Sequence, residues 1–126
     1  MSFKSADGYR RFYQDASMQF TRTAGEGDLT LIAAKANHTT YVQRIIVYIT
    51  TDAAQSWSFE DDNGTPKKIA EVTTSPGDET RWDFDFGDIG VPLTEAKDLE
   101  LNVSAAGLAG HGEVYAYYKL TAVGAA

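Results

Sequence analysis

The chain has 126 residues, a net charge of −7 and no cysteine. This length suits one domain with its own core, and the lack of cysteine excludes disulfides and thiolate metal sites and fits assembly in a reducing cytoplasm. The negative charge argues against a nucleic-acid partner, because phosphates are bound by clustered lysine and arginine. No apolar run approaches the roughly 20 residues that span a bilayer, and the sequence starts without a secretory signal, so we expect a soluble protein with no membrane partner.

The N-terminal part of the chain differs from the rest in charge and in pattern. Residues 1–50 carry a net charge of +2 and residues 51–126 carry −9, which indicates a mildly basic segment attached to an acidic body. The sequence therefore predicts three regions: an N-terminal arm over 1–26, a β-sandwich domain over 27–123 and a frayed C-terminus over 124–126.

One stretch of the arm has the spacing of a short helix. Tyr9, Phe12, Tyr13 and Ala16 fall at positions i, i+3, i+4 and i+7, and Asp7 precedes them as a cap. This pattern predicts a helix at about residues 8–16. An isolated helix of this length is marginal in water, so it would need a surface to lie on.

From residue 27 onward, runs of β-branched and aromatic residues alternate with Gly, Pro, Asn and Asp, which indicates successive strands. Strands are predicted over 28–34, 40–51, 80–86, 98–105 and 112–123, with a hairpin over 56–72 that turns tightly at Asn63-Gly64. The segment 40–51 is apolar on both faces in its middle, which predicts a central strand. Short strands without a long helix between them predict an all-β fold, an antiparallel β-sandwich of the jelly-roll kind.

Two of these strands have contrasting faces. The stretch RWDFDF places Trp82, Phe84 and Phe86 on one face, predicted to lie in the core, and Asp83 and Asp85 on the other. In the last strand, an inward face is predicted for Val114, Ala116, Tyr118 and Leu120, and an outward face for Tyr115, Tyr117 and Lys119.

The sequence offers few groups arranged for chemistry. Asp83 and Asp85 share a face, and paired carboxylates can hydrolyse glycosides, but a strand that buries three aromatic residues also needs polar groups on its wet side. The stretch EDDNG has oxygen ligands that suit calcium, yet Val72 stands where a helix-loop-helix site needs its closing Glu. His38 and His111 stand alone in predicted loops. We therefore predict no enzyme, no metal and no cofactor.

Two groups of residues are predicted to bind a partner. In the arm, aromatic residues surround two arginines, and this combination is enriched at the centres of interfaces. Packing of the arm onto its own domain is an equal alternative, whereas a contact with single-stranded nucleic acid is disfavoured by the acidic body. Tyr115 and Tyr117 form an aromatic stripe on the outward face of the last strand, and such stripes usually mark contact surfaces. The predicted partner-binding residues are Tyr9, Arg10, Arg11, Phe12, Tyr13, Tyr115 and Tyr117.

Three stretches resemble a known class of proteins. LIAAKANHTTYVQRIIVYITTDAAQSWSFED, then DIGVPL, then LELNVSAAGLAGHGEVYAYYKL resemble the small β-sandwich virion proteins of tailed bacteriophages, in the head decoration or cement and fibre-associated class. The resemblance covers about residues 27–120. It implies a jelly-roll-like fold, homo-oligomers that are often trimers, and a virion protein that clamps capsid subunits at their junctions after assembly in the bacterial cytoplasm.

The leading hypothesis is a structural virion protein that binds the major capsid protein through its arm and aromatic faces. The alternative is a carbohydrate-binding module of a viral fibre or tail, in which Tyr115, Tyr117 or Trp82 stacks on a sugar and Asp83 or Asp85 accepts hydrogen bonds from it. A glycosidase that uses Asp83 and Asp85 is the third hypothesis.

Overall fold

A computed structural model describes residues 15–78 and 80–121. The strands, in chain order, are β1 (Met18–Arg22), β2 (Leu29–Ile32), β3 (His38–Ile49), β4 (Gln55–Asp61), β5 (Lys68–Thr74), β6 (Arg81–Asp85), β7 (Val91–Pro92), β8 (Leu99–Val103) and β9 (Gly110–Leu120). Among the residues just given, no segment is helical. The same part of the chain holds no helix with the length and apolar character to cross a membrane.

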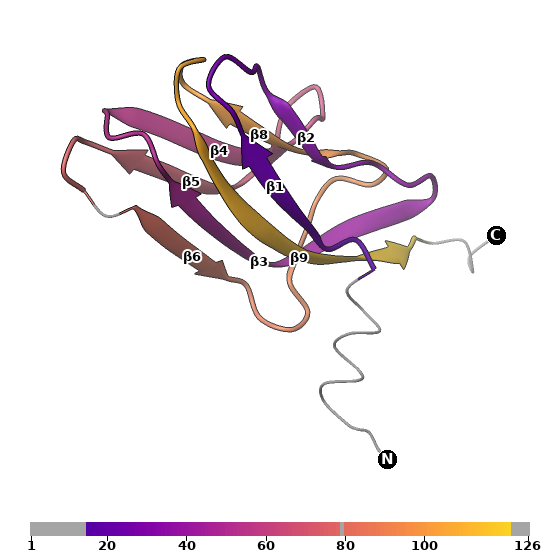
Figure 1. The fold of residues 1–126 in the computed structure, drawn as a ribbon. Coiled ribbons are helices and arrows are strands. Elements are labelled where there is room, and N and C mark those ends of the chain that lie inside the picture. Colours follow the sequence, from indigo (N-terminus) through magenta and orange to yellow (C-terminus); the bar gives the residue numbers. More distant parts are fainter. Residues whose placement is uncertain (1–14, 79, 122–126) are drawn as a thin grey trace.

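The strands form two antiparallel sheets that face each other (Figure 1). The larger sheet has the order β1-β9-β3-β6, with β7 also paired to β3, and the smaller sheet has the order β2-β8-β4-β5. This arrangement confirms the predicted all-β sandwich. It also confirms that the segment around residues 40–51 is central, because β3 lies between β9 and β6.

The core fills the space between the two sheets. The smaller sheet contributes Trp57, Phe59, Leu99 and Leu101, none of which is exposed, and they meet Val42, Ile45, Val47, Val114 and Ala116 of the larger sheet. Burial of one such large side chain stabilises the fold by about 1.5–3 kcal/mol.

The predicted boundary at residue 27 is too late, because β1 lies inside the predicted arm. Strand β1 pairs with β9, from Met18 opposite Val114 to Arg22 opposite Gly110. Its inward residues include Phe20 and Arg22, and a charged residue in that place hides the alternation from sequence reasoning. Arg22 is 2% exposed, and its guanidinium donates hydrogen bonds to the carbonyl oxygens of Leu108 and Glu26.

The aromatic stripe of β6 points inward as predicted, but it is only partly buried. Trp82, Phe84 and Phe86 pack against the core, while Asp83 and Asp85 lie on the outer side. The reason for the incomplete burial is that β6 is the edge strand of its sheet. At the end of β9 the predicted inward position of Leu120 is wrong, since its side chain is 55% exposed.

The hairpin of β4 and β5 is confirmed, but its turn is not the predicted one. A six-residue loop, 62–67, joins the strands, and neither Asn63 nor Gly64 has a positive φ. The buried carboxylate of Asp61 organises this loop instead. It accepts hydrogen bonds from the backbone N–H groups of Lys67 at 2.8 Å and Thr94 at 2.9 Å, and from the Thr94 hydroxyl at 2.7 Å.

These bonds make Asp61 a pH-dependent stabilising group. Burial by itself would raise the pKa of Asp61, but the hydrogen bonds from Lys67, Thr94 and Asn63 favour the carboxylate more strongly, so the pKa lies below its ordinary value of 3.8. A group with a lowered folded pKa stabilises the fold above its unfolded pKa, and this stabilisation disappears as the pH falls through the folded pKa.

We expect Asp61→Asn to lower the free energy of unfolding at pH 7 by about 2–3 kcal/mol, because the amide leaves buried N–H donors unpaired. Urea unfolding at pH 7 and at pH values from 5 down to 2 measures this, and the loss relative to the wild type should shrink at the acid end. Asp28→Asn, at an exposed position just before β2, is the matched control and should change stability by less than about 0.5 kcal/mol. Equal losses for both variants would contradict the role of Asp61.

Candidate functional site

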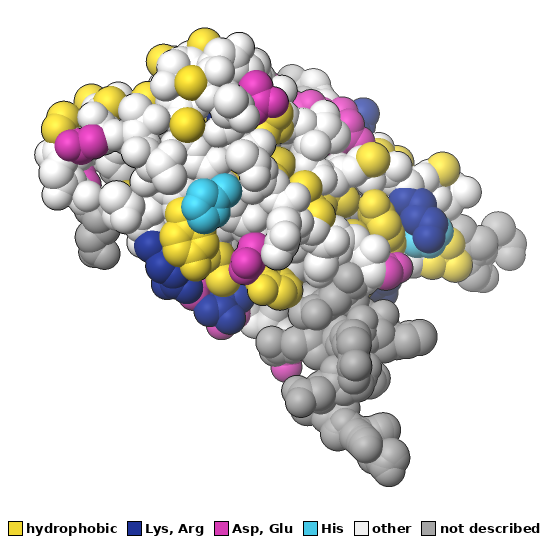
Figure 2. Space-filling model, in the orientation of Figure 1, with side chains coloured by type: hydrophobic (Ala, Val, Ile, Leu, Met, Phe, Trp, Pro, Cys, Tyr) yellow, Lys and Arg dark blue, Asp and Glu magenta, His cyan; other side chains and the backbone are white. Residues whose placement is uncertain are grey.

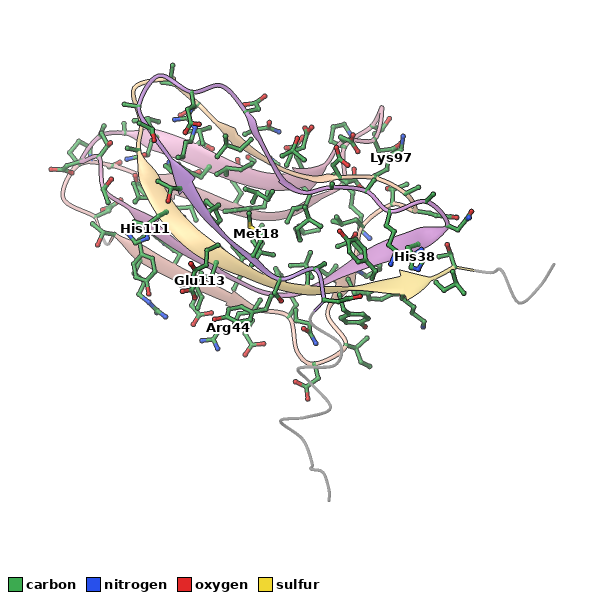
Figure 3. The ribbon with its side chains drawn as sticks, turned by 45° about the vertical axis from the view of Figure 1, so that its right-hand side comes forward. Met18, His38, Arg44, Lys97, His111 and Glu113 are labelled. Atoms are coloured by element: carbon green, nitrogen blue, oxygen red, sulfur yellow. The ribbon has the colours of Figure 1, made fainter. Side chains whose placement is uncertain are left out.

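Three adjacent strands, β6, β3 and β9, carry aromatic and charged side chains on the outer side of the larger sheet. We call this surface the tyrosine face, and its residues are Tyr41, Arg44, Ile46, Tyr48, Arg81, Asp83, His111, Glu113, Tyr115, Tyr117 and Lys119. Figure 3 shows Arg44, His111 and Glu113 projecting from one side of the sheet. In Figure 2 a histidine, hydrophobic, basic and acidic side chains adjoin one another at the lower left.

Tyr48 lies between two cationic or ionisable groups at one end of the tyrosine face. Its ring stacks on the imidazole of His111, with centroids 4.9 Å apart and an interplanar angle of 21°. The guanidinium of Arg81 lies 5.7 Å from the centroid of the same ring, and its Nε donates a hydrogen bond to the Tyr48 hydroxyl at 3.3 Å. The side chains of His111 and Arg81 therefore fix the position of the Tyr48 ring.

Asp83 is bound to arginine rather than paired with Asp85. The Nε of Arg44 donates to one carboxylate oxygen of Asp83 at 2.9 Å, and a second Arg44 nitrogen contacts the other oxygen. The hydrogen bond from Arg44 is the main cause that lowers the pKa of Asp83. Asp85 accepts a hydrogen bond from the N–H of Gly87 at 2.9 Å. A carboxylate held this way is a poor proton donor, so the pair does not have the arrangement that glycoside hydrolysis requires.

At the other end of the tyrosine face, Tyr41 and Tyr117 form a stacked pair. Their ring centroids are 5.3 Å apart with an interplanar angle of 10°, and the Nζ of Lys119 lies 5.6 Å from the Tyr41 centroid. Tyr117 is only 9% exposed and Ile46 only 6%, although neither belongs to the core between the sheets. The tyrosine face is thus a packed second layer of side chains.

Tyr115 lies beside a shallow pocket between β1 and β9. Its hydroxyl donates to Glu113 at 3.1 Å, and burial is the main cause that raises its pKa. The pocket has a volume of about 220 Å³ and is lined by Ser17, Met18, Gln19, Glu113, Val114 and Tyr115. Of the predicted partner-binding residues, Tyr115 and Tyr117 thus lie on one surface, whereas Tyr9, Arg10, Arg11, Phe12 and Tyr13 lie outside the described residues.

The aromatic residues predicted to stack on a sugar do not all share one exposed surface with Asp83 and Asp85. Trp82 points into the sandwich while Asp83 and Asp85 point outward, so these three residues do not face one ligand. Tyr117 stacks on Tyr41 instead of presenting an open ring. The described tyrosine rings therefore give no specific support to a carbohydrate site.

The loop between β6 and β7 completes this end of the surface. Strand β3 has a β-bulge at Gln43, whose side-chain amide donates to the carbonyl oxygen of Asp88 at 2.5 Å. The hydroxyl of Tyr117 donates to the carbonyl oxygen of Ile89 at 2.7 Å. Gly90 has φ +82° and lies close to the backbone of Val42. A Cβ added at Gly90 would be 2.6 Å from the carbonyl oxygen of Val42.

The outer side of the smaller sheet is acidic. The carboxylate oxygens of Asp62, Asp98 and Glu100 lie within 4.8 Å of one another. Burial is the main cause that raises the pKa of Glu100, and the four carboxylates of Asp62, Asp98, Asp28 and Glu60 raise it further. Asp62 and Asp98 already accept backbone hydrogen bonds, from Asp98 and Ala34 respectively. The cluster therefore forms part of the loop structure.

Sequence reasoning missed several residues of the tyrosine face and its adjoining loop, namely Arg44, Tyr48, Arg81 and Ile89. The sequence did contain a signal for Arg44. In YVQRII two consecutive polar residues, Gln43 and Arg44, interrupt an apolar strand, which is the pattern that a β-bulge allows. Tyr48 and Arg81 become neighbours only through the register of β3 and β6, in which they face each other.

Comparisons with known proteins give no family for this chain. No protein-family model matches it, and no curated protein does. Among solved structures, a chain of infectious bursal disease virus, Gx strain, has a TM-score of 0.44 and 16% identity over 87% of this chain and 34% of the viral one. For the Gt strain the TM-score is 0.28 with 13% identity, over 83% and 33% of the two chains. This chain thus spans about a third of the chains it matches, and such weak similarity assigns no function.

Two glycine variants test how the loop between β6 and β7 is held. We expect Gly90→Ala to lower the free energy of unfolding by about 3 kcal/mol or more, because the Cβ clashes with Val42 in addition to the cost of the positive φ. Gly87→Ala has nearly the same φ, +85°, but no atom within 4 Å of the new Cβ. This control should lose only about 1–2 kcal/mol. Urea unfolding of both variants measures the difference, and equal losses would show that Gly90 is not sterically confined.

Proposed function

We propose that this chain is a structural virion protein of a tailed bacteriophage, a capsid decoration or cement protein. It binds the major capsid protein at subunit junctions as a homo-oligomer, with a trimer as the favoured state. Assembly takes place in the cytoplasm of the host bacterium, and the chain then stays in the virion. The proposal rests on the sequence resemblance over residues 27–120 and on the difference between the two outer faces of the sandwich.

That difference between the faces is the observation that carries the proposal. On the tyrosine face and its edge, three cations, Arg44, Arg81 and Lys119, stand against three carboxylates, Asp83, Asp85 and Glu113. The opposite face gathers four carboxylates around that of Glu100. On a chain of charge −7, the balanced aromatic face is the one that another acidic protein can approach with the least repulsion. A balanced aromatic centre is also typical of stable protein interfaces.

The arm would reach its partner from this same face. Ala16 donates its N–H to the carbonyl oxygen of Ala116 at 3.1 Å, and Asp15 accepts the N–H of Tyr118 at 3.0 Å. The described chain therefore begins beside the stacked pair of Tyr41 and Tyr117. An arm that carries Arg10 and Arg11 and starts at this point is placed to extend the contact of the tyrosine face onto the same partner.

Removal of residues 1–14, the part of the predicted arm that precedes the described chain, tests whether the arm binds the capsid. We expect deletion of residues 1–14 to lower occupancy on phage particles at least tenfold, while the free energy of unfolding changes by less than about 1 kcal/mol, since β1 and its contacts remain. Particles made from the encoding genome without this gene are mixed with purified protein and sedimented. Full occupancy by the truncated chain would contradict the role of the arm.

A negative charge added to each outer face in turn tests whether the tyrosine face is the surface that binds the capsid. We expect Tyr48→Glu to weaken particle binding about tenfold or more, because it removes the stacked ring and adds a negative charge to the contact. Thr73→Glu adds the same charge at an exposed position of β5 in the smaller sheet and is the control. It should bind like the wild type in the same sedimentation measurement. Stronger loss for Thr73→Glu would place the contact on the acidic face.

A further inference from the structure

Ile89 is far more exposed than an isoleucine in a well-packed protein usually is. Its side chain is 75% exposed, and it stands in the loop between β6 and β7. Single exposed apolar residues are common on protein surfaces, so exposure alone indicates nothing. The question is whether the loop is built to hold this side chain in the solvent.

The described contacts show that the loop is fixed on both sides of Ile89. Before it, the carbonyl oxygen of Asp88 accepts a hydrogen bond from Gln43, whose side chain is 5% exposed and belongs to the bulge of β3. At Ile89 itself the carbonyl oxygen accepts the Tyr117 hydroxyl. After it, Gly90 packs directly against the backbone of Val42. An exposed apolar side chain on such a braced loop loses little conformational freedom when it is buried by a partner.

We propose that Ile89 is an anchor that inserts into an apolar pocket of the protein partner bound by the tyrosine face. The inference rests on the proposed function and specifies one contact within it. Through Tyr117, the loop is directly bonded to the tyrosine face, and in Figure 1 it lies beside the point where the described chain begins. The loop, the stacked tyrosines and the start of the arm thus form one continuous end of the molecule.

The chemistry around Ile89 favours a protein over a membrane as the occupant. Asp85 is exposed in the same segment, Asp88 is the immediate neighbour of Ile89, and the chain carries −7 overall, all of which oppose an anionic lipid surface. One aliphatic side chain is also too little to hold a protein on a bilayer, where stable anchoring needs larger apolar area. One aliphatic anchor in a pocket is, however, a common centre of a protein interface.

The test compares Ile89→Asp with Leu120→Asp, which introduces the same charge at Leu120, the second large exposed hydrophobic residue among those the structure describes, 55% exposed. Gene-deleted particles are titrated with full-length wild-type or variant protein, and bound protein is measured after sedimentation. We expect Ile89→Asp to weaken binding about 10- to 100-fold, as loss of one buried isoleucine predicts. Leu120→Asp should remain within about threefold of the wild type, and thermal unfolding should show both variants folded.

Each other outcome decides against the inference. If wild type binds and Ile89→Asp binds equally well, Ile89 is no anchor, whereas the proposed function stands. If both Asp variants lose binding to the same extent, the effect is one of added charge, and the inference is again overturned. If wild-type protein does not bind the particles at all, the proposed function fails, and the inference fails with it.

Discussion

Strands β3 and β9 pair along their full length, from His38 opposite Leu120 to Ile49 opposite Gly110, and the remaining strands of the larger sheet attach to one of these two. One extra residue, Gln43, interrupts this ladder as a bulge. The bulge keeps Val42 on the core side and places Arg44 on the outer side, and it directs the Gln43 amide towards the loop after β6. A local irregularity in the central strand therefore determines both the outer surface and the loop at its end.

The two sheets have the same antiparallel construction but differ in what their outer sides can do. On the larger sheet, hydrogen bonds, stacked rings and the pair of Arg44 with Asp83 join the side chains into a second packed layer. On the smaller sheet, carboxylates gather around Glu100, and those of Asp62 and Asp98 accept hydrogen bonds from backbone N–H groups. Such asymmetry favours one orientation of the molecule towards an acidic or neutral partner, because only one side can be desolvated at low cost.

Much of the fold follows from the sequence, because β-branched runs, turn residues and alternation are local signals. The hairpin of β4 and β5 and the central position of β3 needed nothing more than these signals. Strand β1 was missed because Arg22 is buried in part through the carbonyl oxygen of Leu108, which is distant in sequence. Most of the candidate surface was missed for the same reason. The contact of Tyr48 with Arg81 depends on strand register, and the bracing of the loop depends on a bulge.

The edge of the larger sheet has one more consequence. Phe86 donates its N–H to Gln43 and Thr80 accepts the N–H of Ile49, so the alternate residues Arg81, Asp83 and Asp85 direct their backbone groups away from β3. An unpaired edge of this kind is a template on which another chain can add a strand and start aggregation. The three residues of β6 whose backbone groups point outward are all charged. Many copies could thus be crowded side by side at high local concentration without joining one another through the β6 edge.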